Sequence, residues 1–160
     1  MALIVRKAEL KDSSAVDALL SEWFDWKPKS GRIKSVRRAI RRGEVMVALS
    51  ESHVIGFIHY VTHEDIIDGG PNALLSAFYV TPTHRNKGTG SLLLEEAISD
   101  SLSQHAVGIE TSTTHLEAKR LYERHHFRQT VGEIGEVFLE LDFKEYLKNR
   151  PGSHQNLLQP

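Results

Sequence analysis

An anion-binding turn is indicated by eight consecutive residues near the middle of the chain, His84 to Ser91, which read HRNKGTGS. Two glycines one residue apart let the backbone approach a ligand closely, and Arg85 and Lys87 bring positive charge. The apolar run 74–80 precedes this turn, and a helical pattern begins directly after it. Because the start of a helix offers unpaired N–H groups and a positive dipole end, the stretch predicts a site for phosphate or pyrophosphate. The alternative is an ordinary surface turn.

Two widespread phosphate-binding motifs do not fit this turn, whose spacing is R-x-x-G-x-G. The chain contains no G-x-x-x-x-G-K-[ST], because Lys87 precedes the glycines instead of following them. A dinucleotide fingerprint would need a third glycine. The turn therefore indicates an anion site of another kind.

Composition limits the classes of protein that could hold such a site. With 160 residues the chain is long enough for one domain, which we place at 1–148 ahead of a tail at 149–160. The formal net charge of −1 gives no overall attraction to nucleic acid or to a membrane. The absence of cysteine excludes disulfides, thiolate metal sites and a cysteine nucleophile. No apolar run approaches the roughly 20 residues of a membrane span, and Arg6 and Lys7 interrupt any signal-peptide core, so we expect a cytoplasmic protein.

Hydrophobic periodicity predicts strands and helices along the whole of that domain. The expected strands are 3–5, 44–49, 54–61, 74–80, 106–111, 127–131 and 136–142, with a hairpin of the second and third and a polar loop from Thr62 to Asn72. The expected helices run from Asp12 or Ser13 through Trp23, within 27–42, over 91–103, from a Thr114–Glu117 capping box to 124–126, and as a final turn at 144–148.

Two segments of the N-terminal half have more than one interpretation. The cluster EWFDW at 22–26 contains Trp23 and Trp26, which either close the edge of the core or wall a substrate pocket. The predicted helix within 27–42 carries eight Lys and Arg residues and no acid. Its outer face is either an ordinary solvated surface, or it attracts an anionic cofactor or an acidic or nucleic-acid partner.

The loop 62–72 gathers His63, Glu64 and Asp65 at adjacent positions. Neighbouring residues of an extended chain point to opposite faces, and no fixed ligand spacing is present, so a metal site is not expected. Recognition of a cationic substrate by Glu64 and Asp65 is the stronger hypothesis.

A second motif runs from His115 to Phe127 and reads HLEAKRLYERHHF. Together with the R-x-x-G-x-G turn, which follows Val80-Thr81-Pro82, it resembles the GCN5-related N-acetyltransferase (GNAT) family. The second motif of that family is N-x-x-A-x-x-L-Y-x-x-x-G-F. Four residues of this chain are in register with it: Ala118, Leu121, Tyr122 and Phe127.

The chain departs from the family motif at two positions, where His115 replaces Asn and His126 replaces Gly. The resemblance implies that the first change would alter a contact to the pantetheine arm of the family's cofactor, acetyl-CoA. The second places a non-glycine residue at a helix C-terminus, where left-handed backbone geometry is disfavoured although His tolerates it better than most residues.

The resemblance spans Leu3 to about Phe143 and implies a mixed α/β fold in which a central, mostly antiparallel sheet is flanked by helices. It implies acetyl-CoA as the co-substrate and no metal. The turn would hold the pyrophosphate, and the edge of the preceding strand would pair with the pantetheine amides, because an amide-bearing arm can mimic a strand. The implied cofactor-binding residues are Phe78, Tyr79, Val80, Arg85, Asn86, Lys87, Gly88, Thr89, Gly90, Ser91 and His115.

Tyr122 occupies the position from which this family often protonates the coenzyme A thiolate. Its phenol, with an ordinary pKa of about 10, is protonated at neutral pH and can donate; the alternative is a tyrosine that only packs on its helix. The base is less defined, because Ser76 or Ala77 stands at the strand position that carries an acid in many relatives. Glu110, His115 or a water chain from either could replace that acid, and Glu110 is preferred because it lies at the end of a predicted central strand. The alternative is that Glu110 is an ordinary glutamate that faces solvent.

The resemblance implies transfer of acetyl from acetyl-CoA to a primary amine by direct attack, without a covalent enzyme intermediate. Trp23, Trp26, Glu64 and Asp65 favour a small cationic or amino-acid-like amine as acceptor. Two alternatives stay open: a protein or peptide acceptor, docked by the basic helix, and a non-catalytic acetyl-CoA-binding regulatory module. A homodimer is compatible with a small enzyme, whereas neither a membrane nor nucleic acid is an expected partner.

Overall fold

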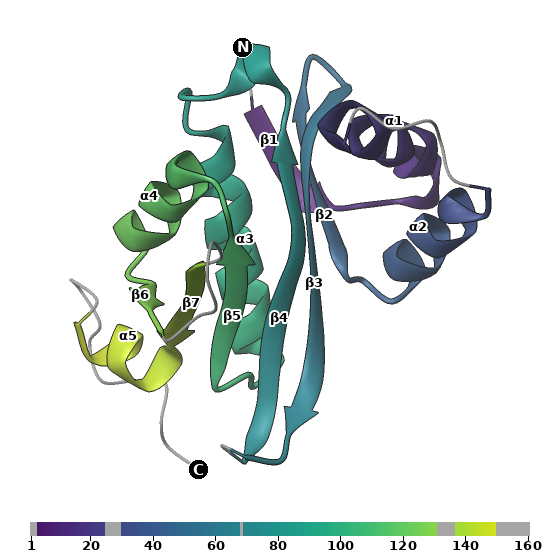
Figure 1. The fold of residues 1–160 in the computed structure, drawn as a ribbon. Helices are drawn as coiled ribbons and strands as arrows, with labels where there is room; N and C mark the ends of the chain where they lie inside the picture. The colour runs from purple at the N-terminus through teal and green to yellow at the C-terminus, as the bar shows by residue number, and fades with distance from the viewer. Residues whose placement is uncertain (1–2, 25–29, 68, 131–136, 150–160) are drawn as a thin grey trace.

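The computed structural model describes residues 3–24, 30–67, 69–130 and 137–149. Within these ranges the chain forms one mixed sheet with helices on both faces (Figure 1). The elements are β1 (Leu3–Lys7), η1 (Leu10–Asp12), α1 (Ser13–Phe24), α2 (Arg32–Arg41), β2 (Val45–Ser50), β3 (His53–Asp65), β4 (Gly70–Val80), η2 (Pro82–His84), α3 (Thr89–Ser103), β5 (Gly108–Thr113), α4 (Leu116–Arg124), β6 (Arg128–Gln129), β7 (Val137–Asp142) and α5 (Phe143–Asn149).

The sheet of the described residues has seven strands in the order β1-β2-β3-β4-β5-β7-β6. All neighbouring strands run antiparallel except β4 and β5, which are parallel. The fold class predicted from the sequence is therefore confirmed.

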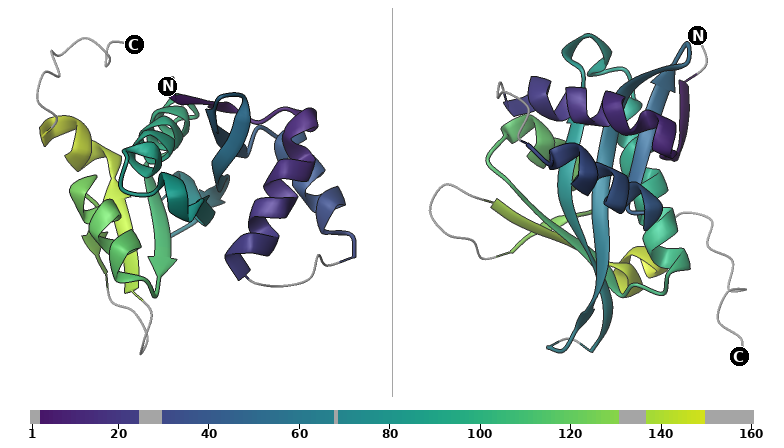
Figure 2. Two further views of the ribbon diagram at one scale, coloured as in Figure 1. Left: turned by 90° about the horizontal axis from the view of Figure 1, so that it is seen from above. Right: turned by 90° about the vertical axis from the view of Figure 1, so that its right-hand side faces the viewer.

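The two faces of the sheet are covered by different helices. Helices α1 and α2 lie on one side, and α3, α4 and α5 lie on the other (Figure 2). The helix α2 buries Val36 and Ile40 against the sheet side and exposes Lys34, Arg37, Arg38 and Arg41, as expected for an apolar stripe at helical spacing. Arg32, at its start, instead forms an ion pair with Asp17 of α1. On the opposite face, Leu93 and Leu94 of α3 are fully buried in the larger core.

A cluster of three polar side chains, Lys7, Tyr60 and Asp100, holds α3 against the sheet. The Lys7 ammonium on β1 donates to Asp100 Oδ2 at 2.6 Å and to the Tyr60 hydroxyl at 2.6 Å, and that hydroxyl in turn donates to Asp100. Three elements, β1, β3 and α3, are thereby joined at one point. This contact and the buried leucines set the direction in which the N-terminus of α3 points.

The parallel junction between β4 and β5 is very short. Over their full described lengths the two strands pair only at Ala73–Ile109 and Leu74–Glu110. Beyond these pairs each strand keeps its antiparallel partner, β3 for β4 and β7 for β5. The sheet is therefore split toward the carboxyl ends of both strands.

The strand β4 also contains a bulge next to this split. His59 of β3 pairs with Ala77, whereas Tyr60, the next residue along β3, pairs with Leu75, so Ser76 has no partner in the ladder. An extra residue in one strand locally re-aims the side chains around it.

Two local predictions were wrong, and each has a physical reason. The segment Thr62 to Asn72 is not a loop, because β3 continues to Asp65 and β4 begins at Gly70; its cross-strand ladder overrides the polar composition that suggested a loop. The capping box is also absent at the predicted place, since the N-cap of α4 is His115, and the Thr113 hydroxyl accepts from its backbone N–H.

Several predictions fall partly outside the described residues. Lys27 and Lys29 lie there, and the basic helix as described begins at Arg32. Asn149 ends α5, and the remainder of the expected tail is not among the described residues. No helix in the described part of the chain is long and apolar enough to span a membrane.

Candidate active site

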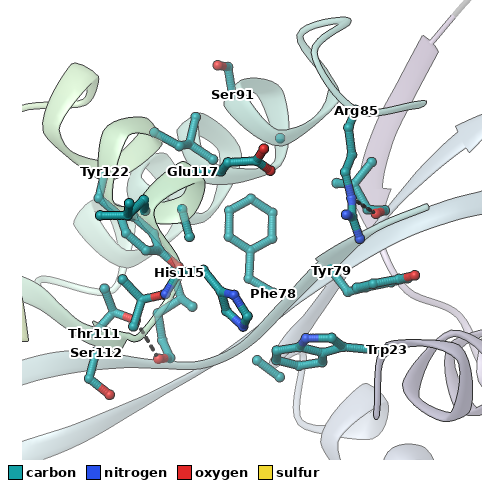
Figure 3. A pocket seen from close by; sticks show the side chains of 18 of the residues that line it. Trp23, Phe78, Tyr79, Arg85, Ser91, Thr111, Ser112, His115, Glu117 and Tyr122 are labelled. Atoms are coloured by element: carbon teal, nitrogen blue, oxygen red, sulfur yellow. Dashed lines mark hydrogen bonds between the residues drawn. The ribbon is translucent and has the colours of Figure 1, made fainter. Parts of the chain in front are cut away.

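A cavity of about 920 Å³ opens where β4 and β5 separate. Its lining comes from the end of α1, the second half of β4, the turn before α3, the first turn of α3, the end of β5, and α4 (Figure 3). Residues far apart in the sequence are thus brought together by a gap in the sheet, and the amide edges of both strands border that gap.

The cavity reaches both faces of the sheet. On the α3 and α4 face it is lined by Phe78 and Tyr122, whose ring centroids are 6.3 Å apart. On the α1 face it is lined by Tyr79 and Trp23, with ring centroids 6.0 Å apart. Because Phe78 and Tyr79 are consecutive on β4 and point to opposite sides, two ligands could approach the gap from opposite faces.

Tyr122 lies deep on the α4 side of the cavity. Its side chain is 3% exposed and packs against Phe78 and Phe127. Burial raises the pKa of Tyr122 to about 12, and a hydrogen bond with Thr111 opposes that rise. The Thr111 hydroxyl also donates to the Leu75 carbonyl on β4 at 3.1 Å. The phenol is therefore a proton donor throughout the physiological pH range.

The turn predicted to bind an anion forms the N-terminal end of α3. Gly88 is the N-cap in left-handed geometry, with φ of 85°, and no side chain caps the helix. The first hydrogen bond of the helix runs from the Leu92 N–H to the Gly88 carbonyl. The N–H groups of the residues before Leu92 therefore have no acceptor within the helix. A Cβ on Gly90 would lie 3.3 Å from Leu121 and 3.6 Å from Phe78, so a larger residue there would require the Leu121 side chain to shift.

The predicted cofactor residues divide into two groups by position. Lys87, Gly88 and Thr89 belong to the turn but not to the cavity lining. The cavity itself is lined by Phe78, Tyr79, Val80, Arg85, Asn86, Gly90, Ser91 and His115. In Figure 3 the ring of His115 projects into the space between Tyr122 and Trp23.

Arg85 and Glu117 give the cavity its charge next to α3. Arg85 Nε donates to the Val80 carbonyl at 2.9 Å, and its guanidinium lies 5.3 Å from the centre of the Tyr79 ring. These contacts hold the cation beside β4. The Glu117 carboxylate, from the first turn of α4, also points into the cavity (Figure 3). An anionic ligand would therefore rely on the α3 terminus and Arg85 to outweigh one acid.

A negative charge also lies on the α1 side, at Glu22, to which the sequence analysis assigned no role. Glu22 lines the cavity, and its Oε1 accepts a hydrogen bond of 2.9 Å from the Tyr79 hydroxyl. Burial and this contact raise the pKa of Tyr79. The available signal was the position of Glu22 next to Trp23 in the aromatic cluster, but only the fold brings it to Tyr79.

Three predicted polar residues lie elsewhere. Glu110 does not line the cavity, because it is paired with Leu74 at the last point where β4 and β5 are still joined. Glu64 and Asp65 lie at the far end of the β3–β4 hairpin and are not in the lining either. Trp26 lies outside the described residues. In the described part of the chain, no group of three or more His, Asp and Glu side chains could hold a metal ion.

Solved structures of acetyltransferases have a similar fold at low sequence identity. An N-acetyltransferase from Staphylococcus aureus Mu50 aligns with a TM-score of 0.71 at 20% identity, over 89% of this chain and 99% of that one. The polyamine N-acetyltransferase of Drosophila melanogaster gives 0.72 at 11% identity, over 88% and 100%. A chain of the NatC complex, bound to Gag peptide and CoA, gives 0.74 at 18% identity, over 89% and 99%.

Comparison of the sequence with known proteins and families gives the family of the chain. A search of curated proteins found no match to the chain. The sequence model of the acetyltransferase (GNAT) domain, however, matches residues 41–129, which is more than half of the chain and runs from the end of α2 through β6. That match contains the split strands, the α3 turn and Tyr122, and it shows that the chain belongs to the GNAT acetyltransferase family.

Proposed function

We propose that this protein transfers an acetyl group from acetyl-CoA to a primary amine by direct attack within a ternary complex. The observation that carries the proposal is the cavity in the split sheet, which is open to the α3 and α4 face and to the α1 face. Acetyl-CoA and the amine can then occupy the cavity at the same time, one from each face of the sheet. No cysteine is present to carry the acetyl group in between.

The donor would bind on the α3 and α4 side. Asn86, Gly90 and Ser91 line the cavity at the N-terminus of α3, and the unpaired N–H groups and positive dipole end of a helix N-terminus favour a pyrophosphate there. The edge of β4 at Phe78 and Val80 faces the split, where an amide-bearing arm can replace the missing strand. Lys87, Gly88 and Thr89 would act through the shape and charge of the turn.

Tyr122 would protonate the departing sulfur. It is the buried phenol at the cavity wall on the donor side, and its raised pKa of about 12 keeps it protonated at neutral pH, so that it can donate to the sulfur as the C–S bond breaks. A positioned acid of this kind typically contributes about 10²–10⁴-fold to a rate.

The acceptor side favours a small amine with a second positive charge. Glu22 offers a carboxylate bonded to the Tyr79 hydroxyl, close to the Trp23 and Tyr79 rings, and aromatic rings attract cations as well. Glu22 thereby takes the role that the sequence analysis gave to Glu64 and Asp65. The same side of the cavity is open enough that a peptide amine is the second acceptor to test, and a member of the NatC complex has a similar fold.

The test is a thiol-release assay with acetyl-CoA and a panel of diamines, monoamines and peptides. We expect release with diamines, and titration calorimetry should show coenzyme A binding without any acceptor. Release with peptides alone would replace the small-amine proposal, and binding without release would indicate a regulatory module. Absence of coenzyme A binding would overturn the function altogether.

Glu22→Gln and Glu64→Gln separate the two candidate acids. Loss of one charged contact of about 1.4 kcal/mol should raise the KM for a diamine about tenfold in Glu22→Gln. The KM for a monoamine should change little, because it has no second charge to bind. The same diamine shift in Glu64→Gln instead would return the acceptor site to the hairpin.

A further inference from the structure

Three side chains form a line that starts at the cavity and leads away from it through the sheet face covered by α1 and α2. Ser76 lines the cavity, its Oγ lies 2.6 Å from His59 Nδ1, and His59 Nε2 lies 3.7 Å from Glu44 Oε2. We propose that Ser76, His59 and Glu44 form a relay that takes a proton from the acceptor amine. This inference rests on the proposed acetyl transfer and supplies its missing base.

The bulge in β4 places Ser76 at the start of the relay. Ser76 has no ladder partner, since His59 pairs with Ala77 and Tyr60 pairs with Leu75. Its hydroxyl therefore reaches sideways to the His59 ring while it still lines the cavity. His59 is two residues from Phe57, which packs in the α1 and α2 core, so the relay is on the acceptor side of the sheet.

The contacts of His59 determine which of its two ring nitrogens carries the proton. The Glu44 carboxylate near Nε2 favours the tautomer with a proton on Nε2. In that tautomer Nδ1 has a free lone pair and accepts the Ser76 hydroxyl proton. Serine alone cannot hold a proton at neutral pH, but a serine bonded to a neutral imidazole can pass one on.

The surroundings of His59 keep the ring neutral before reaction. Burial lowers the pKa of His59, and Glu44 opposes that effect. The other charged group nearby is Arg42, at the end of α2, whose Nη1 lies 3.9 Å from Glu44 and so weakens its influence. A neutral imidazole can accept a proton, and the side chain is 28% exposed, which gives that proton a way out to water.

The transfer balances with these groups. Ser76 takes one proton from the alkylammonium acceptor as its own proton passes to His59, which becomes imidazolium beside Glu44. The freed nitrogen lone pair forms the C–N bond to the acetyl carbon, and the C–S bond breaks as Tyr122 protonates the sulfur. The second amine proton restores Tyr122, and His59 releases its proton to water. One ammonium and one thioester give one amide, one thiol and one proton.

The test compares His59→Gln and Ser76→Ala with two control variants. His63→Gln removes a second histidine from the same strand, and Ser76→Thr keeps the hydroxyl. The acceptors are a simple alkyl diamine and its fluorinated analogue, whose reacting nitrogen is far less basic and is already neutral at neutral pH. Coenzyme A titration of every variant checks that the donor site is intact.

With the alkyl diamine at neutral pH, kcat/KM should fall about 100-fold in His59→Gln and in Ser76→Ala, within the range for a lost general base. The loss should shrink for the fluorinated amine, and for the alkyl diamine as the pH approaches its ordinary pKa of about 10, because water then removes the proton. Ser76→Thr should restore most of the rate that Ser76→Ala loses, because it keeps the hydroxyl, and His63→Gln should keep nearly the wild-type rate. Long-range ¹H–¹⁵N spectra should show His59 protonated at Nε2 in the resting protein.

Two kinetic results would overturn the relay alone. The first is a wild-type rate in His59→Gln; the second is an equal loss for both amines at every pH, which would indicate a structural contact between β3 and β4. If the wild-type protein binds coenzyme A but acetylates no amine, the proposed function fails and the relay fails with it. A resting His59 protonated at Nδ1 would also contradict it, whatever the activity.

Discussion

At the scale of single residues, the strongest chemical assignment concerns the hydroxyl of Tyr122. This oxygen contacts Thr111, and the ring is held by Phe78 and Phe127, so removing the oxygen changes little of the packing. Tyr122→Phe should lower kcat by about 10²-fold or more, because a general acid is lost. Calorimetry should give a coenzyme A affinity close to that of the wild type. The assay follows thiol release at saturating acceptor.

Thr111→Val serves as the matched control for that variant. It removes the hydroxyl that Tyr122 contacts but leaves the phenol in place. Its rate should fall much less than that of Tyr122→Phe. Comparable losses in the two variants would mean that the pair acts by positioning, and turnover at the wild-type rate in Tyr122→Phe would assign the acid to another group.

The role of a residue could be predicted only where that residue lies within a short sequence motif. The role predicted for Tyr122 comes from the resemblance of residues 115–127 to the family motif, and Tyr122 does line the cavity. His59 and Ser76 are 17 positions apart, and their contact depends on the pairing of β3 with β4 and on a one-residue bulge. Neither property is visible in periodicity, so Glu110 was preferred as base although it precedes the split.

At the scale of elements, α2 and α3 allow the anion-binding turn to be tested against its own geometry. Gly31 and Gly88 are the N-caps of these helices, with φ of 85° in both and ψ of −11° and −10°. A Cβ at either position would meet nothing within 4 Å. Gly88→Asp should abolish coenzyme A binding in calorimetry, because it adds a negative charge where the pyrophosphate would lie.

Gly31→Asp is the control, since it adds the same charge and the same backbone strain at a helix terminus that does not line the cavity. It should keep its coenzyme A affinity. If Gly88→Asp also kept its affinity, the helix terminus could not be the pyrophosphate site. Equal losses in both variants would point to general destabilisation instead.

The end of α4 offers a prediction about stability. His126, which stands where the related motif has glycine, adopts left-handed geometry with φ of 68°. A Cβ in that geometry costs about 1–2 kcal/mol, and the exposed ring has only a contact with Tyr146 to lose. His126→Gly should therefore raise the free energy of unfolding by about 0.5–1 kcal/mol in urea titration.

His125→Gly, at the neighbouring position, is the control and should lower the free energy of unfolding. His125 has φ of −97°, so glycine there gains no relief of strain and loses about 1 kcal/mol through added freedom of the unfolded chain. It also loses the packing of a ring that is only 14% exposed. Destabilisation of both variants to the same extent would show that φ at His126 carries no strain.

Element order was largely predictable because apolar periodicity survives in every buried strand and helix. The failures occurred where long-range pairing decides the structure. Thr62 to Asp65 is polar, yet it is a strand because β4 lies beside it. The start of α4 was misplaced because Thr114 and Glu117 satisfy a local capping pattern, whereas the chain from β5 enters the helix at His115.

At the scale of the whole molecule, access from both faces predicts the order of events in kinetics. Lines in double-reciprocal plots of rate against acetyl-CoA at several amine concentrations should intersect, as required for a ternary complex. A non-reactive coenzyme A analogue should compete with acetyl-CoA and not with the amine. Parallel lines would require an acetylated enzyme and would contradict direct attack.

The split sheet has one more consequence, for the behaviour of the protein in a tube or a cell. Beyond Leu74, over the described residues of β4, the strand has no ladder partner on its β5 side, which leaves an internal edge of the kind that can recruit another chain. A ligand arm bound along it would act as a removable strand and mask that edge. At a hundred times its Kd such a ligand would add about 2.7 kcal/mol to stability. Resistance to aggregation would thus follow the supply of coenzyme, and storage with it would preserve the protein.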